Sequence, residues 1–133
     1  MIFRPSFPLA AGMLALLIGG AALAQGPERV NFASGNDNAA VEASVIGNDV
    51  RDYVLGAAAG QTMSVSLSTE GNAYFNILPP GSQGEAIFNG SIDGPDATLE
   101  LPADGDYTIR VYLMGGDADG GRTVPFTLSM TIM

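Results

Sequence analysis

The chain has 133 residues, 14 of them Asp or Glu and five Lys or Arg, so its formal net charge at pH 7 is −9. It contains no His, Cys or Trp. Without imidazole and thiol groups, the chain lacks the residues of common serine and cysteine hydrolases and of most zinc sites. Nucleic acid and anionic membrane surfaces are also poor partners, because both are bound through Lys and Arg.

Residues 1–24 have the pattern of a secretory signal peptide. Arg4 precedes an apolar stretch, 9–23, and the small residues Ala22 and Ala24 stand where signal peptidase requires them. The apolar stretch is about 15 residues long, whereas a membrane-spanning helix needs about 20. We therefore expect cleavage after Ala24, export to the periplasm or beyond, and no membrane attachment afterwards. Residues 25–133 are expected to form a single β-sandwich domain.

Apolar residues recur at every second position in several segments after Ala24, which is the period of a strand with one buried face. In chain order, this alternation predicts strands at 29–33, 41–46, 53–55, 62–68, 73–78, 86–89, 97–101, 106–114 and 124–132. Turns rich in Gly, Pro, Asn and Asp separate them, and no window of 11 or more residues has a helical period. The pattern predicts an all-β fold, an antiparallel β-sandwich of about eight short strands.

Pro125 marks a special position in the last predicted strand. Proline has no backbone N–H, so it cannot donate to a neighbouring strand. We expect the strand 124–132 to lie at a sheet edge there, or to be bulged.

The acidic residues are numerous, but nearly all of them stand in turns beside Gly, Asn or Pro. Asp is favoured in such turns for local hydrogen bonding, so the sequence predicts neither an enzyme nor a cofactor. The segments 36–38 and 117–120 place oxygen ligands two residues apart, yet neither completes the signature of a calcium loop. A solvated acidic turn is the favoured interpretation, and a calcium site is the alternative.

Tyr112 and Met114 are predicted to point away from the core, just before a Gly-rich loop at 115–121. Large side chains beside such a loop suit a surface that binds a protein partner. The alternative is that they cover the second face of a central strand.

Several segments resemble known families. The run from Leu101 to Val111, with Gly60-Gln61 and 52–55, resembles the pre-peptidase C-terminal type of secreted β-sandwich. This resemblance implies the alternative function, a carbohydrate- or calcium-binding accessory module. More closely, residues 29–132 resemble the small periplasmic inhibitors of g-type (goose-type) lysozyme. The further matching elements are Val30-Asn31-Phe32, Ile46-Gly47 followed by Tyr53, Glu70-Gly71, Asp117-Ala118 and the closing alternating strand.

This resemblance implies a non-catalytic exported protein that inserts loops into a protein partner, a g-type lysozyme or another exported protein. In the family, an aromatic residue of one loop and arginines of another contact acidic groups of the lysozyme cleft. Those positions correspond here to Asn48, Gly115 and Asp119, and Arg122 can replace the arginines in part. The expected partner-binding residues are Asn48, Tyr112, Gly115, Gly116, Asp117, Ala118, Asp119 and Arg122.

Overall fold

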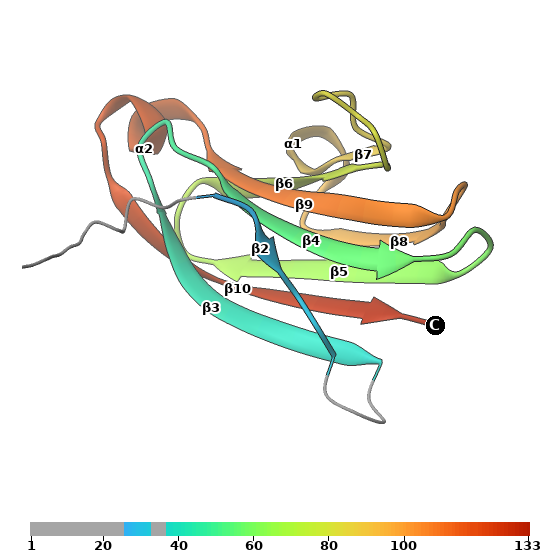
Figure 1. Cartoon of the computed structure of the whole chain (residues 1–133). Coiled ribbons are helices and arrows are strands. Elements are labelled where there is room, and N and C mark those ends of the chain that lie inside the picture. Colours follow the sequence, from blue (N-terminus) through green and yellow to red (C-terminus); the bar gives the residue numbers. More distant parts are fainter. Residues whose placement is uncertain (1–25, 33–36) are drawn as a thin grey trace, which may run out of the picture.

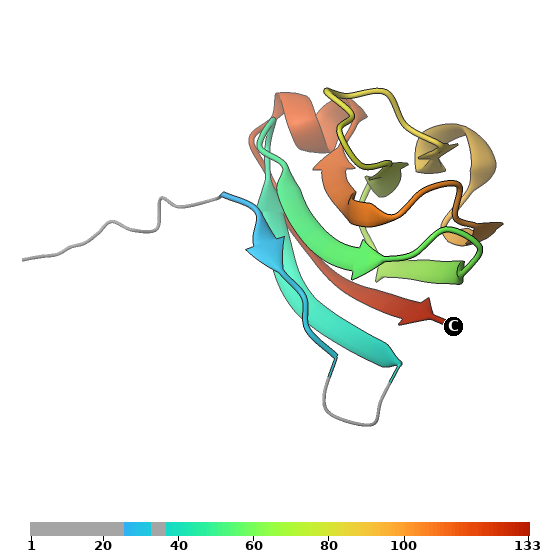
Figure 2. The same ribbon diagram turned by 45° about the vertical axis from the view of Figure 1, so that its right-hand side comes forward.

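The computed structural model describes residues 26–32 and 37–133 (Figure 1). The predicted signal peptide, 1–24, lies outside the described residues. The described part of the chain forms two β-sheets that pack face to face, with two short helices beside them (Figures 1 and 2). The predicted all-β sandwich is therefore confirmed.

Each sheet combines strands that are distant in the sequence. The four-stranded sheet has the order β3 (Asn38–Ile46), β10 (Thr123–Ile132), β5 (Thr62–Thr69), β8 (Asp96–Glu100). The five-stranded sheet has the order β2 (Glu28–Arg29), β4 (Arg51–Ala57), β9 (Gly105–Leu113), β6 (Ala73–Leu78), β7 (Phe88–Asn89). All neighbouring strands are antiparallel except β2 and β4. The described residues thus form nine strands, and each overlaps one of the nine segments that the alternation predicts, although the fold was expected to have about eight.

The core lies between the two sheets and follows the alternation in the sequence. In β9, Tyr107, Ile109 and Val111 are completely buried, whereas the residues between them face outward. Leu128 of β10 and Met63 of β5 face them from the other sheet and are also completely buried. The period of two therefore assigns each side chain to the core or to an outer face.

Pro125 lies where its missing N–H has the least effect. It is paired with Ser44 of β3, but the ladder between β10 and β5 begins one residue later, with Phe126 opposite Thr69. β10 is a central strand for most of its length, yet at Pro125 it has a strand partner on one side only. The expectation of a local edge is confirmed.

The helices α1 (Gly90–Asp93) and α2 (Gly115–Asp119) were not predicted. They have four and five residues, which is too short to give a helical period in the sequence. α1 begins where the side chain of Asn89 accepts a hydrogen bond from the backbone N–H of Ser91. Among the described residues, no helix has the length and apolar character needed to cross a membrane.

Candidate functional site

Three loops meet at one end of the sandwich, which we call the loop end: residues 47–50, 70–72 and 114–122. α2 and the turn between β3 and β4 lie side by side there in both views (Figures 1 and 2). The backbone N–H of Gly47 donates to the carbonyl oxygen of Arg122 at 2.9 Å. The N–H of Met114 donates to the carbonyl oxygen of Asn72 at 3.1 Å. The three loops are therefore connected through their backbones.

The carboxylate of Asp117 connects the loops further. One of its oxygens accepts a hydrogen bond from the backbone N–H of Asn72 at 2.8 Å. The other lies 3.5 Å from Nη1 of Arg122, and the backbone N–H of Arg122 donates to the carbonyl oxygen of Asp117. Hydrogen bonds to an ionised acceptor are stronger than neutral ones. Loop 114–122 is therefore folded back against its neighbours and does not project as a free finger.

Small residues permit this close packing. Ala118 is 7 % exposed and belongs to the core, so α2 is anchored in the sandwich. Gly47 has a φ of +57°, and a Cβ atom there would lie 3.2 Å from the Cα of Gly121. A side chain at position 47 would therefore be strained and would press against loop 114–122.

The expected partner-binding residues divide into two groups at the loop end. Asp117 and Ala118 face inward and stabilise the loop conformation. The exposed residues are Asn48, Gly115, Gly116, Asp119 and Arg122. The Arg122 side chain is 69 % exposed, so its guanidinium group is available to a partner.

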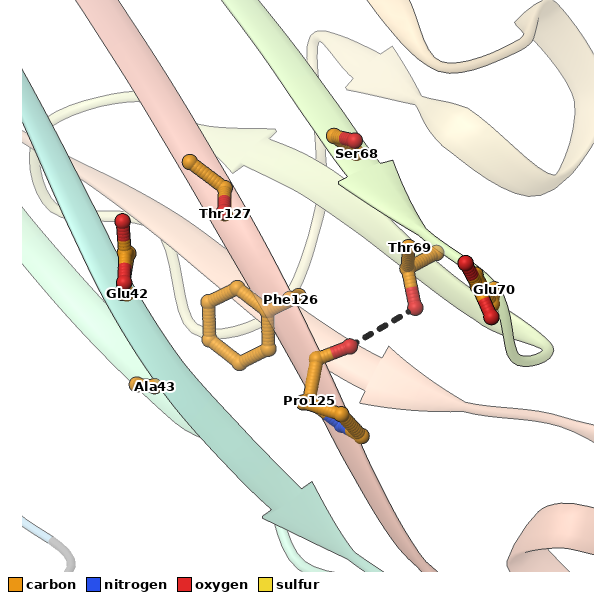
Figure 3. A pocket seen from close by; sticks show the side chains of 8 residues that line it. All are labelled: Glu42, Ala43, Ser68, Thr69, Glu70, Pro125, Phe126 and Thr127. Carbon is orange, nitrogen blue, oxygen red and sulfur yellow. Dashed lines mark hydrogen bonds between the residues drawn. The ribbon is translucent and has the colours of Figure 1, made fainter.

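Two shallow depressions adjoin the loop end. One has a volume of about 340 Å³ and is lined by Glu70, Gly71, Asp117, Arg122, Thr123, Val124 and Pro125. The other, of about 370 Å³, is lined by Glu42, Ala43, Ser68, Thr69, Glu70, Pro125, Phe126 and Thr127 (Figure 3). Glu70 and Pro125 line both, so the depressions are neighbours. Among the described residues, no three Asp or Glu side chains converge on a common point that suits a metal ion.

Tyr112 lies apart from the exposed loop residues. It belongs to β9, between β4 and β6, and its side chain is on the outer face of the five-stranded sheet. Its ring centroid is 6.1 Å from that of Tyr74, its neighbour on β6. Its hydroxyl donates to Oδ1 of Asn76 at 2.8 Å. Sequence reasoning missed Tyr74, because only the pairing of β6 with β9 brings it beside Tyr112.

Comparison with known proteins gives a consistent set of relatives. The chain is 28 % identical over 123 residues to the "Inhibitor of g-type lysozyme" of Escherichia coli strain K12, covering 90 % of this chain and 91 % of that protein. It is 40 % identical to PliG of Aeromonas hydrophila, a periplasmic lysozyme inhibitor of g-type lysozyme. The structures superpose with a TM-score of 0.75, covering 80 % of this chain and 96 % of the other.

A more distant likeness concerns the fold alone. The pre-peptidase C-terminal domain of a Bacillus anthracis collagenase has a TM-score of 0.58 and is 18 % identical, covering 81 % of this chain and 95 % of that domain. No protein-family model matches the chain. The inhibitors, which combine higher identity with closer superposition, are the more informative relatives.

Proposed function

Because the chain belongs to the family of periplasmic inhibitors of g-type lysozyme, we propose that it binds a g-type lysozyme through the loop end. The proposal includes export by a signal peptide at 1–24, followed by action as a non-catalytic binding protein. The main observation in support of this site is that the three loops are held together by hydrogen bonds and leave the Arg122 side chain exposed at their surface. The similarity to inhibitors over nearly their whole length supports the proposed partner.

The geometry of the loop end supports tight association for a physical reason. Loops that are already ordered lose little conformational freedom when a partner binds, so more of the interaction energy contributes to affinity. Gly47 and Asp117 provide that order, through close backbone approach and through hydrogen bonds.

Arg122 is the cation that we propose to enter the partner's cleft. Its only ion pair among the described residues is the 3.5 Å contact with Asp117, and a guanidinium group has five N–H donors. It can therefore also bind a carboxylate of the partner through two parallel hydrogen bonds. Asn48, exposed on the adjacent loop, adds an amide group to the same surface.

Inhibition of cell-wall lysis tests the proposal directly. Purified residues 25–133 are titrated against a g-type lysozyme, and we expect inhibition at micromolar concentration. Arg122→Ala should weaken inhibition by about tenfold or more, the value of one charge-assisted contact. Arg29→Ala is the matched control, because Arg29 is half exposed and pairs with Asp106 at the other end of β9. Absence of inhibition at about 100 μM would refute the proposed partner.

A gain-of-function variant makes the test sharper. Asp119 occupies a position where the family resemblance implies an arginine, and an exposed Asp repels carboxylates of a partner. Asp119→Arg should therefore strengthen inhibition. Asp93→Arg makes the same charge change at an exposed residue of α1, which lies apart from α2 and the loop end (Figure 1). Equal improvement by both variants would show a general effect of net charge and would contradict the proposed site.

A further inference from the structure

The outer face of the five-stranded sheet carries an ordered set of polar and aromatic side chains. Asn89, Asn76, Arg110 and Asp52 lie opposite one another in a row across β7, β6, β9 and β4. In the next row, Tyr74 and Tyr112 lie opposite each other on β6 and β9. We call these six residues the aromatic–amide strip.

The two tyrosine rings are fixed along the sheet. Tyr74 donates its hydroxyl proton to Oδ1 of Asn72, two residues away on the same face. Tyr112 donates to Oδ1 of Asn76 on the neighbouring strand β6. Asn76 is paired with Arg110, so this acceptor also lies two residues along the strand from Tyr112. Each ring must therefore extend along its strand, since its hydroxyl could not otherwise reach that partner. Both side chains are partly exposed, so the strip presents aromatic surface to solvent.

The side-chain amides of Asn76 and Asn89, beside these rings, have unused hydrogen-bond donors. Oδ1 of Asn76 accepts from the Tyr112 hydroxyl and, at 3.3 Å, from the backbone N–H of Gly90. Oδ1 of Asn89 accepts from the N–H and the hydroxyl of Ser91. Within the described part of the chain, neither amide NH₂ group donates a hydrogen bond. Each of them can therefore donate to an acceptor supplied by a ligand.

Charge on the strip is already neutralised. Arg110 makes two hydrogen bonds to the carboxylate of Asp52, at 2.8 and 2.9 Å. The hydrogen bond to Asp52 and its charge raise the pKa of Arg110, partly offset by burial. An anionic ligand would find no unpaired cation here and would approach a chain of net charge −9. The strip therefore favours a neutral ligand with both apolar and hydroxyl-bearing surface.

We propose that the aromatic–amide strip binds a neutral oligosaccharide chain. The C–H faces of sugar rings pack on aromatic rings, and their hydroxyl or acetamido oxygens accept hydrogen bonds from amide groups. A protein partner is less favoured, because the row beside the tyrosines consists of amide and charged groups and not of the apolar residues typical of an interface core. The strip adjoins the loop end through the hydrogen bond from Tyr74 to Asn72, but it shares no residue with the loop end and does not depend on the proposed lysozyme partner.

Isothermal titration calorimetry of residues 25–133 tests the proposal with two neutral probes, cellohexaose and chitohexaose. We expect saturable binding of at least one. The difference between the probes shows whether hydroxyl or acetamido oxygens are preferred. Tyr74→Ala should weaken binding by about tenfold, whereas Tyr74→Phe, which keeps the ring, should stay within about threefold. Ser66→Ala, on the outer face of the other sheet, and Arg122→Ala, at the loop end, should leave it unchanged.

Nuclear magnetic resonance of the unaltered chain keeps the test independent of variant folding. Added oligosaccharide should shift the backbone amide signals of Tyr74, Asn76, Asn89 and Tyr112, and leave those of 115–122 in place. No heat and no shifts with either probe would overturn the proposal, as would binding that Tyr74→Ala leaves intact. Loss of lysozyme inhibition in both Tyr74→Ala and Tyr112→Ala, without any sugar binding, would instead identify the strip as a protein interface, because Tyr112 makes no side-chain hydrogen bond to the described residues of the loop end.

Discussion

The hydroxyl of Tyr107 donates a hydrogen bond to the carbonyl oxygen of Ala103 at 2.6 Å and accepts one from its backbone N–H at 3.0 Å. Both backbone groups of Ala103 are thus satisfied by one buried side chain, which closes the connection between β8 and β9. Tyr53 is also completely buried, but its hydroxyl has no hydrogen-bond partner among the described residues. Within residues 26–32 and 37–133, the hydroxyl of Tyr107 is hydrogen-bonded to the backbone and that of Tyr53 is not, and this difference permits a comparison of the two hydroxyl groups.

Tyr107→Phe should lower the free energy of unfolding by about 1–3 kcal/mol, because it leaves the Ala103 backbone groups without their partner. Tyr53→Phe should be neutral or stabilising, because it removes a buried hydroxyl that has no partner. Urea unfolding followed by circular dichroism measures both. Equal destabilisation by the two variants would show that ring packing, and not the hydrogen bonds to Ala103, explains the loss.

Tyr53 should also make the protein sensitive to alkali. Burial raises the pKa of its phenol above the usual 10.0, with Arg51 opposing and Glu28 adding to the shift. The folded state therefore retains a proton that the unfolded state has lost, so stability is complete below about pH 10 and falls as pH rises through the folded pKa. The chain has no Lys or Cys that would titrate in this range. The urea midpoint should fall above about pH 10, and less steeply in Tyr53→Phe.

Gly47→Ala should destabilise the protein by about 1–2 kcal/mol, because the residue has φ +57° and faces Gly121 at close range. Gly116→Ala is the control within the same loop end. A Cβ atom there would have no neighbour within 4 Å, and alanine favours the helical backbone of α2 by up to about 1 kcal/mol. Thermal unfolding should therefore shift in opposite directions for the two variants. An unchanged melting temperature in Gly47→Ala would mean that the close approach of loops 47–50 and 114–122 does not contribute to stability.

The strands were predictable because each long strand buries one face. β6 begins and ends where the alternation of Ala73, Phe75 and Ile77 predicted. β7 is shorter than expected, two residues instead of 86–89, and β2 overlaps the expected strand 29–33 only at Arg29, while residue 33 lies outside the described residues. Both strands lie at the edges of a sheet and pair over two residues each. Alternation reports which face is buried, but it does not report how far a neighbouring strand extends.

The site was less predictable, because its contacts join residues that are distant in the sequence. Asp117 was expected in the important loop, but its hydrogen bond to Asn72 spans 45 positions and depends on the packing of the two loops. Ala118 was expected at the partner surface and proves to be part of the core. The position of Tyr74 beside Tyr112 likewise follows from strand register, which hydrophobic pattern alone does not give.

Asp117→Ala should destabilise the protein by about 1–3 kcal/mol, because it removes an ionised acceptor from the Asn72 N–H and the counter-ion of Arg122. Asp119→Ala is the matched control, since Asp119 is exposed and should change stability by less than about 0.5 kcal/mol. Urea unfolding measures both variants, and hydrogen exchange of the Asn72 amide reports the local contact.

The two readouts separate a local role of Asp117 from a general one. If its carboxylate fixes the loops, the Asn72 amide should exchange faster in Asp117→Ala even under conditions where the protein remains folded. Inhibition of lysozyme should then weaken too, because loops that are no longer ordered must become so on binding. Unchanged exchange at Asn72 would contradict this role, and the order of the loop end would then rest on the backbone hydrogen bonds between the loops and on the packing of Gly47 and Ala118.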